Sequence, residues 1–207
     1  MTQVPVGRRP DGGISSIKAY PSKRVAIFSY ISTMQPNFPI EYLQFYTATI
    51  LEWKQLLADD KHKDIIINSL QFLVTEKRII LNAFVVMSNH IHLIWQPTFH
   101  FTLTDIQASF MKYTAQQLKR SLGESNAAQL EEFKVNKYDR AYQIWKREPL
   151  SVELRTHDVF IQKLNYIHYN PVRAGLCINP EDYCYSSARF YYDGNDAFKM
   201  ITHFSGN

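Results

Sequence analysis

The chain has 207 residues, of which 45% are hydrophobic and 14% aromatic, and its formal net charge is +4. This fits one globular domain with a sizeable core plus a tail, and the basic balance is compatible with a polyanionic partner without requiring one. No stretch reaches the about 18 apolar residues of a membrane span, and the first residues lack the apolar core of a signal peptide. The two cysteines, Cys177 and Cys184, are too few for a zinc knuckle. We therefore expect a cytoplasmic protein with free thiols and no membrane association.

Residues 1–38 differ in composition from the rest of the chain. They hold four of the nine prolines, two pairs of basic residues and no long periodic pattern. We predict a flexible extension with one short ordered piece at 25–31, followed by a single domain over 39–207. The basic pairs are explained either by contact with nucleic acid or by a solvated tail.

Strand-like and helix-like segments alternate along the predicted domain. Runs rich in β-branched and aromatic residues predict strands, and apolar residues at a spacing of three to four predict helices. The expected order is a strand at 42–50, a short helix at 52–60, a helix at 61–78, strands at 78–87 and 90–97, a helix at 104–122, a strand at 141–148 and a helix at 157–170. This order predicts an α+β fold in which helices pack on an antiparallel sheet. No glycine-rich loop follows a strand, which disfavours a dinucleotide-binding fold.

Two long helices have predicted buried stripes. The stripe of the first consists of Ile65, Ile66, Leu70, Leu73 and Val74. The stripe of the second consists of Ile106, Phe110, Tyr113 and Leu118. For the second helix we expect Thr104 as the N-cap, with Gln107 three residues on as in a capping box.

The segment 83–94, AFVVMSNHIHLI, combines an apolar run with two histidines separated by one isoleucine. Ser88-Asn89 fits a two-residue turn between antiparallel strands. Side chains alternate between the two faces of a strand, so His90 and His92 are expected on one face, with Ile91 on the other. Two imidazoles held in this way can share one divalent metal ion.

The helix that runs into Pro171 carries Tyr166 and Asn170, one turn apart on the same face. Taken alone, Tyr166 fits a half-buried core residue and Asn170 fits a helix cap before the proline. Taken with the histidine pair, they fit phosphodiester chemistry. A tyrosine hydroxyl is a nucleophile, and a divalent ion neutralises the phosphate that it attacks. Asn170 can supply a third ligand if its helix lies across the histidine strand.

Together the two motifs resemble a known family. NHIHLI looks like the histidine–hydrophobic–histidine motif of HUH nucleases, and KLNYIHYNPVRAGL looks like the tyrosine helix of single-tyrosine transposases, in particular the REP-associated tyrosine transposases. The resemblance covers about residues 42–200. It implies a ferredoxin-like fold and an endonuclease and strand transferase that cleaves single-stranded DNA, often beside a hairpin, through a 5′-phosphotyrosine.

By the match of motifs, His90 and His92 are metal ligands, Tyr166 is the nucleophile and Asn170 is the third ligand or an orienting group. The resemblance implies Mg²⁺ or Mn²⁺ as the ion. Related insertion-sequence enzymes build their sites across a dimer, whereas REP-associated relatives act as monomers. A homodimer and a monomer therefore both stay open.

Several further side chains are candidates for DNA contact. The basic candidates are Lys112, Lys119, Arg120, Arg147 and Arg173, each with a solvated surface as the alternative. The aromatic candidates for base stacking are Trp95, Trp145 and Tyr113, with the core as the alternative for the tryptophans. His168 lies roughly 200° around the helix from Tyr166, so we expect a structural or DNA-backbone role for it and not a place in the metal site.

Two other functions compete with strand transfer. One is a catalytically inactive nucleic-acid-binding module on the same fold, which would not need the histidine pair or Tyr166. The other is a metallohydrolase for small substrates. The lack of further acidic or histidine ligands near the pair and the short chain, too short for a (β/α)₈ barrel, count against it.

Overall fold

A four-stranded antiparallel sheet forms the centre of the computed structural model, which describes residues 43–204. The strands lie in the order β2-β3-β1-β6, so the histidine-bearing strand β3 (His90–Pro97) is central. It pairs on one side with β2 (Ile79–Val86) and on the other with β1 (Gln44–Thr49). The edge strand β6 (Leu150–Glu153) pairs with β1. The predicted extension 1–38 lies outside the described residues, so the domain boundary stays a prediction.

The long helices are α2 (Asp60–Thr75), α3 (Leu103–Ser125) and α5 (His157–Arg173). With two of the long helices, the strands of the sheet follow one another along the chain in the order β1-α2-β2-β3-α3-β6. This strand–helix–strand–strand–helix–strand order is that of a ferredoxin-like fold. After these six elements the chain adds a third long helix on the opposite face. The predicted α+β class is therefore confirmed. None of the helices in the described part of the chain is long and apolar enough to cross a membrane.

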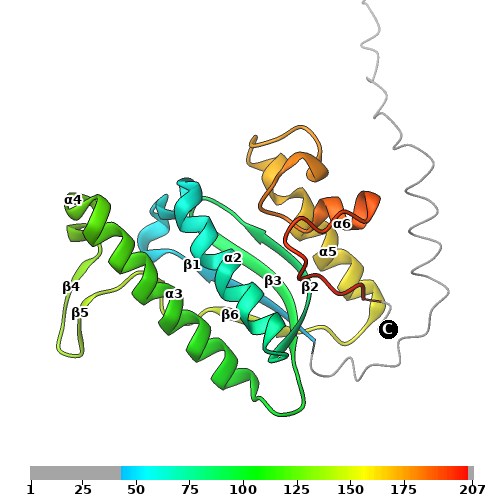
Figure 1. Cartoon of the computed structure of the whole chain (residues 1–207), viewed down its shortest axis with the longest axis horizontal. Helices are drawn as coiled ribbons and strands as arrows, with labels where there is room; N and C mark the ends of the chain where they lie inside the picture. The colour runs from blue at the N-terminus through cyan, green and yellow to red at the C-terminus, as the bar shows by residue number, and fades with distance from the viewer. Residues whose placement is uncertain (1–42, 205–207) are drawn as a thin grey trace, which may run out of the picture.

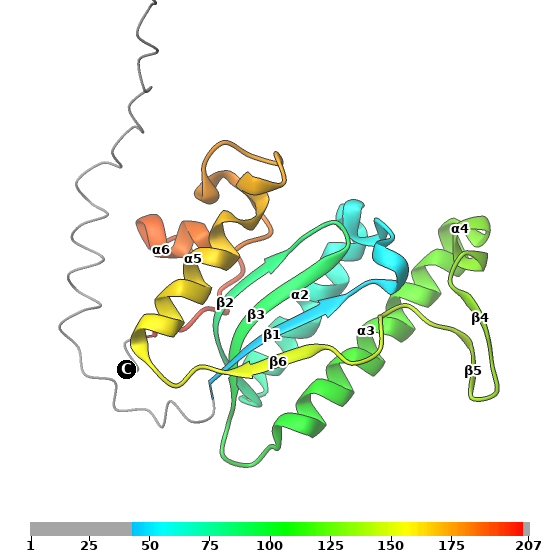
Figure 2. The ribbon, with the colours of Figure 1, turned by 180° about the vertical axis from the view of Figure 1, so that it is seen from behind.

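Short elements fill the connections between these long ones. They are the 3₁₀ turns η2 (Leu51–Trp53), η3 (Leu56–Ala58) and η4 (Pro180–Asp182), the helices α4 (Ala127–Glu131) and α6 (Ala188–Asp193), and the strands β4 (Lys134–Lys137) and β5 (Arg140–Tyr142). In place of the helix expected at 52–60 there are two 3₁₀ turns, because Glu52 and Trp53 have positive φ angles. The paired strands β4 and β5 form an arm that projects beyond the sheet below α4 (Figures 1 and 2).

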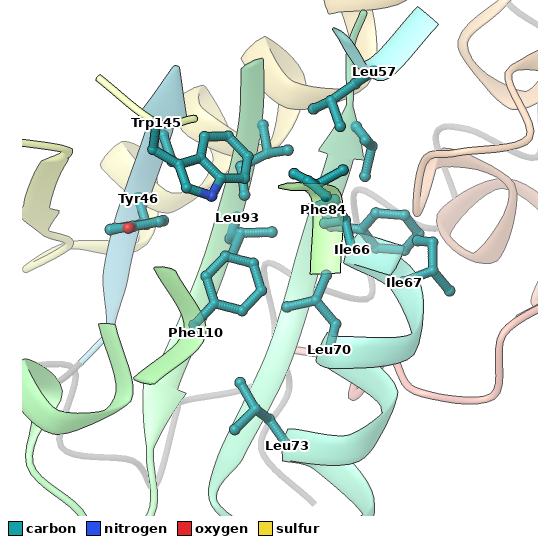
Figure 3. Packing of buried hydrophobic residues seen from close by; sticks show 14 of the residues in the cluster. Tyr46, Leu57, Ile66, Ile67, Leu70, Leu73, Phe84, Leu93, Phe110 and Trp145 are labelled. Atoms are coloured by element: carbon teal, nitrogen blue, oxygen red, sulfur yellow. The ribbon is translucent and has the colours of Figure 1, made fainter. Parts of the chain in front are cut away.

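One face of the sheet is closed by α2 and α3, which lie side by side over it (Figure 1). Apolar side chains from the sheet and both helices form a dry core there, including Tyr46, Leu70, Leu93 and Phe110 (Figure 3). These four side chains are at most 1% exposed. The tight packing of this face fixes the positions of the strands that carry the site on the other face.

Two details of the α3 prediction were wrong. The N-cap is Thr102, whose hydroxyl accepts a hydrogen bond from the Asp105 amide, and not Thr104. The buried stripe contains Thr114 in place of Tyr113, which is half exposed. Thr114 tolerates burial because its hydroxyl donates to the Phe110 carbonyl and accepts from the Trp145 indole. Ile65 and Val74, expected in the α2 stripe, lie at its partly buried margin.

The opposite face of the sheet is covered by α5. The helix begins at the N-cap Thr156, and its apolar side chains Phe160, Leu164 and Ile167 pack against residues of β2 and β3. It continues through Pro171 and ends at Arg173. Asn170 therefore lies inside the last turns of the helix and does not cap it, so the helix-cap interpretation of this residue was wrong.

Candidate active site

The hairpin of β2 and β3 places the histidine pair as the alternation predicted. The amide of Met87 donates to the His90 carbonyl at 2.8 Å, which closes a turn with Ser88 and Asn89 at its tip. His90 and His92 lie on the α5 face, and their ring centroids are 4.7 Å apart. Ile91, between them, is fully buried in the core on the other face.

Each imidazole is oriented through its Nδ1 atom. Nδ1 of His90 lies 2.7 Å from the Asn89 Oδ1 atom, which can only accept, so Nδ1 carries the proton and Nε2 keeps its lone pair. Nδ1 of His92 lies 2.7 Å from the Thr47 hydroxyl on β1, which can accept in the same way. Hydrogen bonds of this kind fix the tautomer and the ring orientation of metal-binding histidines.

The second nitrogen of His92 is the clearest sign of a ligand site. Nε2 is buried and has no hydrogen-bond partner within residues 43–204. Five other buried side-chain atoms within residues 43–204 also lack a partner, so what distinguishes His92 Nε2 is its place beside His90 on the face that carries Tyr166. The residues present therefore fit a divalent cation. No cluster of three histidine, cysteine or acidic side chains exists in the described part of the chain, so a cation bound by this pair would need a third ligand of another type.

Burial keeps both histidines in the form that binds metal. It lowers the pKa of His90, and it lowers the pKa of His92 to about 3, with smaller contributions from the neighbouring charges of His90 and Lys163. Both rings are therefore neutral near pH 7, and no proton has to leave before a cation binds.

The α5 helix brings Tyr166 beside this pair. The Tyr166 ring centroid lies 5.1 Å from that of His92 and 6.0 Å from that of Phe45. Tyr166 is 40% exposed, so its side chain is partly open to solvent and is not enclosed in the core. Asn170 follows one turn later and is partly buried. The condition set by the sequence, that this helix lies across the histidine strand, is met by its packing on β2 and β3.

Two cations flank the tyrosine on the same helix. Lys163 Nζ lies 4.7 Å from the Phe45 ring centroid and 5.9 Å from the Tyr166 ring centroid. Arg173 Cζ lies 5.4 Å from the Tyr166 ring centroid. Arg173 was a candidate from its sequence position, whereas Lys163 was not predicted. Its spacing of three residues before Tyr166 was the available signal, because positions 163, 166, 170 and 173 share one helical face.

The site is open on one side. In Figure 2, α5 lies toward the β2 side of this face of the sheet, and no described helix crosses β1 and β6. On the uncovered part, Leu150 and Val152 of β6 are 55% and 39% exposed. An extended polymer therefore has room to approach the histidines across β1 and β6.

The remaining candidates for DNA contact lie in different parts of the structure. Lys112 and Arg147 line a common groove, whereas Lys119 is exposed elsewhere on α3 and Arg120 pairs with Glu124. The tryptophans named as candidates for stacking, Trp95 and Trp145, are both core residues. His168 is buried, with Nε2 3.0 Å from the Ser187 hydroxyl, as expected for a structural role.

Two solved structures are similar to this chain. A structure of a REP-associated tyrosine transposase bound to a REP hairpin matches with a TM-score of 0.52 and 18% identity, covering 84% of this chain and 95% of that one. The two chains share one fold. A putative transposase from Deinococcus radiodurans matches with a TM-score of 0.41 and 15% identity, over 65% of this chain and 95% of that one. No family model and no curated protein matches the sequence.

Proposed function

We propose that the chain is a metal-dependent endonuclease and strand transferase for single-stranded DNA, of the REP-associated tyrosine transposase type. One observation carries this proposal: the unpartnered Nε2 atom of His92 lies on the same face as an accessible tyrosine, with the two rings 5.1 Å apart. A purely DNA-binding module has no need of an oriented, neutral histidine pair. The shared fold adds support, because the solved relative is a transposase.

His90 and His92 would hold Mg²⁺ or Mn²⁺ through their Nε2 atoms, and Asn170 would complete the set through its amide oxygen. When bound, the ion neutralises the scissile phosphate and polarises its oxygens. Imidazole ligands favour Mn²⁺ over Mg²⁺, which prefers an all-oxygen shell. Asn89 and Thr47 hold the two rings through their Nδ1 atoms, which leaves the Nε2 atom of each ring for the ion.

The Tyr166 hydroxyl oxygen attacks the phosphorus. A bond from this oxygen to phosphorus forms as the bond from phosphorus to the 3′ oxygen breaks, the phenolic proton leaves to water, and the 3′ oxygen takes a proton from water. The products are a 5′-phosphotyrosine and a free 3′ hydroxyl. Attack by a 3′ hydroxyl reverses the step and releases the tyrosine. One phosphodiester is exchanged for another, so no external energy source is required.

Lys163 and Arg173 would offset the negative charge of the phosphate. Their side chains lie on either side of Tyr166 along the helix, where they attract the phosphate and offset the negative charge that develops during attack. The solved relative was bound to a REP hairpin, which supports hairpin DNA with a single-stranded flank as the substrate here.

The test is covalent capture. The full-length protein is incubated with 3′-labelled hairpin DNA and Mn²⁺, with a chelator as the control, and the mixture is separated on a denaturing gel. The label stays with the 5′-phosphotyrosine fragment, so a slow band that needs metal is expected. Tyr166→Phe should abolish the band, and Tyr169→Phe, which removes the hydroxyl three residues further along α5, should keep it.

Two results would contradict the proposal. An adduct that survives in Tyr166→Phe would show that another group attacks. Hairpin binding with no adduct under any metal condition would support the inactive binding module instead.

A further inference from the structure

A second feature with nucleic-acid chemistry lies at the edge of the sheet. A groove of about 460 Å³ runs between α3 and the chain segment from β5 to β6. Gln107, Met111 and Lys112 line it from α3, and Trp145, Lys146 and Arg147 line it from the other side. It is separate from the face that carries Tyr166.

The lining of this groove suits a nucleotide chain. Its apolar part comes from side chains such as Met111 and Ile144, which can contact a base. Its charged part has four cations and one acid, although the whole chain has a net charge of only +4. Arg140 and Arg147 share Asp139 as a partner. Lys112 and Lys146 are exposed, and neither has an acidic partner within residues 43–204, so their charges are free for phosphates.

The groove is also close to the histidine pair. The amide of Lys146 donates to the Thr49 carbonyl at 2.7 Å, and Thr49 is paired with His90 across β1 and β3. The segment 144–146 thus extends the sheet by one strand at the end where β3 begins. Two strand spacings of about 4.8 Å separate the backbones of Lys146 and His90, so they lie on the order of 10 Å apart.

Hydrogen bonds connect the two walls of the groove. Gln107 Nε2 donates to the Ser151 hydroxyl at 2.9 Å, and Ser151 donates to Gln44, which ties α3 to β6 and β1. The Trp145 indole donates to Thr114 of α3. A site that exists before binding loses less entropy when its ligand binds.

We infer that this groove binds the single-stranded flank of the DNA whose phosphodiester is held at the histidine pair. Bases contact the apolar floor, and the phosphates lie along Lys112, Lys146 and Arg147. Single-stranded DNA is commonly bound in this way, by a cationic groove with apolar or aromatic surfaces for the bases. The inference rests on the proposed function only for the course of the DNA from the groove to the histidine pair. Binding of single-stranded DNA in the groove does not depend on it.

Binding is measured by the fluorescence anisotropy of a labelled oligodeoxythymidylate of about 16 nucleotides, in chelator so that no cleavage occurs. Lys112→Ala/Arg147→Ala should weaken binding by about tenfold and reduce the slope of log affinity against log salt by about 1.4, or 0.7 for each phosphate contact. The control Lys119→Ala/Arg120→Ala removes two cations of α3 that do not line the groove and should change affinity less than twofold. Thermal unfolding checks that all variants fold. The charge reversal Lys112→Glu/Arg147→Glu should weaken DNA binding more than the alanine variant does.

Equal losses in the groove variant and the control would overturn the inference, as would unchanged binding in the groove variant. Ultraviolet cross-linking of the thymines followed by peptide mapping gives an independent readout. Cross-links within 107–115 or 142–149 are expected, and cross-links confined to 157–173 would contradict the groove. Adduct formation, measured separately with hairpin DNA and Mn²⁺, tests the proposed function. Weaker binding by the groove variant, with no adduct formed by the wild type, would support the groove and contradict the proposed catalysis. An adduct formed by the wild type, with unchanged binding by the groove variant, would support the catalysis and contradict the groove.

Discussion

The two faces of the sheet differ in what they bury. Under α2 and α3 the side chains of the strands are almost all apolar and fully enclosed (Figure 3). Under α5 the same strands carry His90, His92 and Thr47 beside an apolar cluster around Phe45. Neighbouring residues of one strand, such as His92 and Leu93, therefore lie on opposite faces. One face is closed by two helices over an apolar core, and the other combines an apolar core under α5 with the polar side chains of the candidate site.

This division predicts that function and stability can be separated by substituting adjacent residues. His92→Ala removes a ligand with an unsatisfied nitrogen, so we expect metal-dependent adduct formation to fall by about 10³-fold while unfolding changes little. Mn²⁺ should raise the thermal midpoint of the wild type and not that of the variant. A variant that keeps its response to Mn²⁺ would show that the ion binds elsewhere.

The opposite result is expected one residue further on. Leu93→Ala leaves a cavity in the closed core, so the free energy of unfolding should fall by about 3 kcal/mol. Denaturant titration measures this loss. At denaturant concentrations below its unfolding transition, the variant should still bind Mn²⁺ with an affinity close to that of the wild type. A loss of metal binding in the folded variant would contradict the separation of stability and function between the two faces.

A smaller effect is expected from the cation that precedes the nucleophile. Lys163→Ala removes one charge near the phosphate, so the rate of adduct formation should fall about tenfold, or about 1.4 kcal/mol in the barrier. Lys163→Arg should restore much of it because the charge is kept. Lys61→Ala, on α2 behind the sheet, is the control and should leave the rate unchanged. An unaffected rate in Lys163→Ala would mean that the phosphate lies nearer to Arg173.

The smallest effect concerns pH. His92 is neutral in the folded protein down to about pH 3, whereas in the unfolded chain it binds a proton below about 6.5. The unfolded state therefore binds more protons in this window, and stability decreases as the pH falls. Between pH 6.5 and 5.5 His92 alone should cost about 1 kcal/mol. His92→Leu should lose this part of the dependence, and an identical pH profile in both proteins would contradict the assigned pKa.

The positions of the candidate site residues could be predicted where they depend on spacing within a single strand or helix. Alternation along one strand placed His90 and His92 on one face, and the spacing along one helix placed Tyr166 with Asn170. The partner of His92 was not predictable, because Thr47 lies 45 positions away and reaches it only through the pairing of β1 with β3. A Thr47→Val variant tests this contact directly: we expect about tenfold weaker Mn²⁺ binding, measured by calorimetry, with little loss of stability.

Two of the errors in the fold prediction have the same origin. β6 was missed because it has only four residues after Pro149, and its pairing with β1 comes from a distant part of the sequence. Tyr113 was placed in the buried stripe because it is aromatic. The structure instead buries Thr114, whose hydroxyl is satisfied by Trp145 from a different element. In each case a contact between distant segments outweighed the local pattern.

One consequence of the α5 geometry concerns changes in chain length. The apolar contacts Phe160, Leu164 and Ile167 fix the rotation of the helix, and Lys163, Tyr166, Asn170 and Arg173 share another side of it. Each residue turns an α-helix by about 100°. Deleting one residue between Phe160 and Lys163 would therefore leave the composition nearly unchanged but swing the hydroxyl away from the histidines. A point substitution on α5 changes one of these positions, whereas a deletion between Phe160 and Lys163 displaces all four at once.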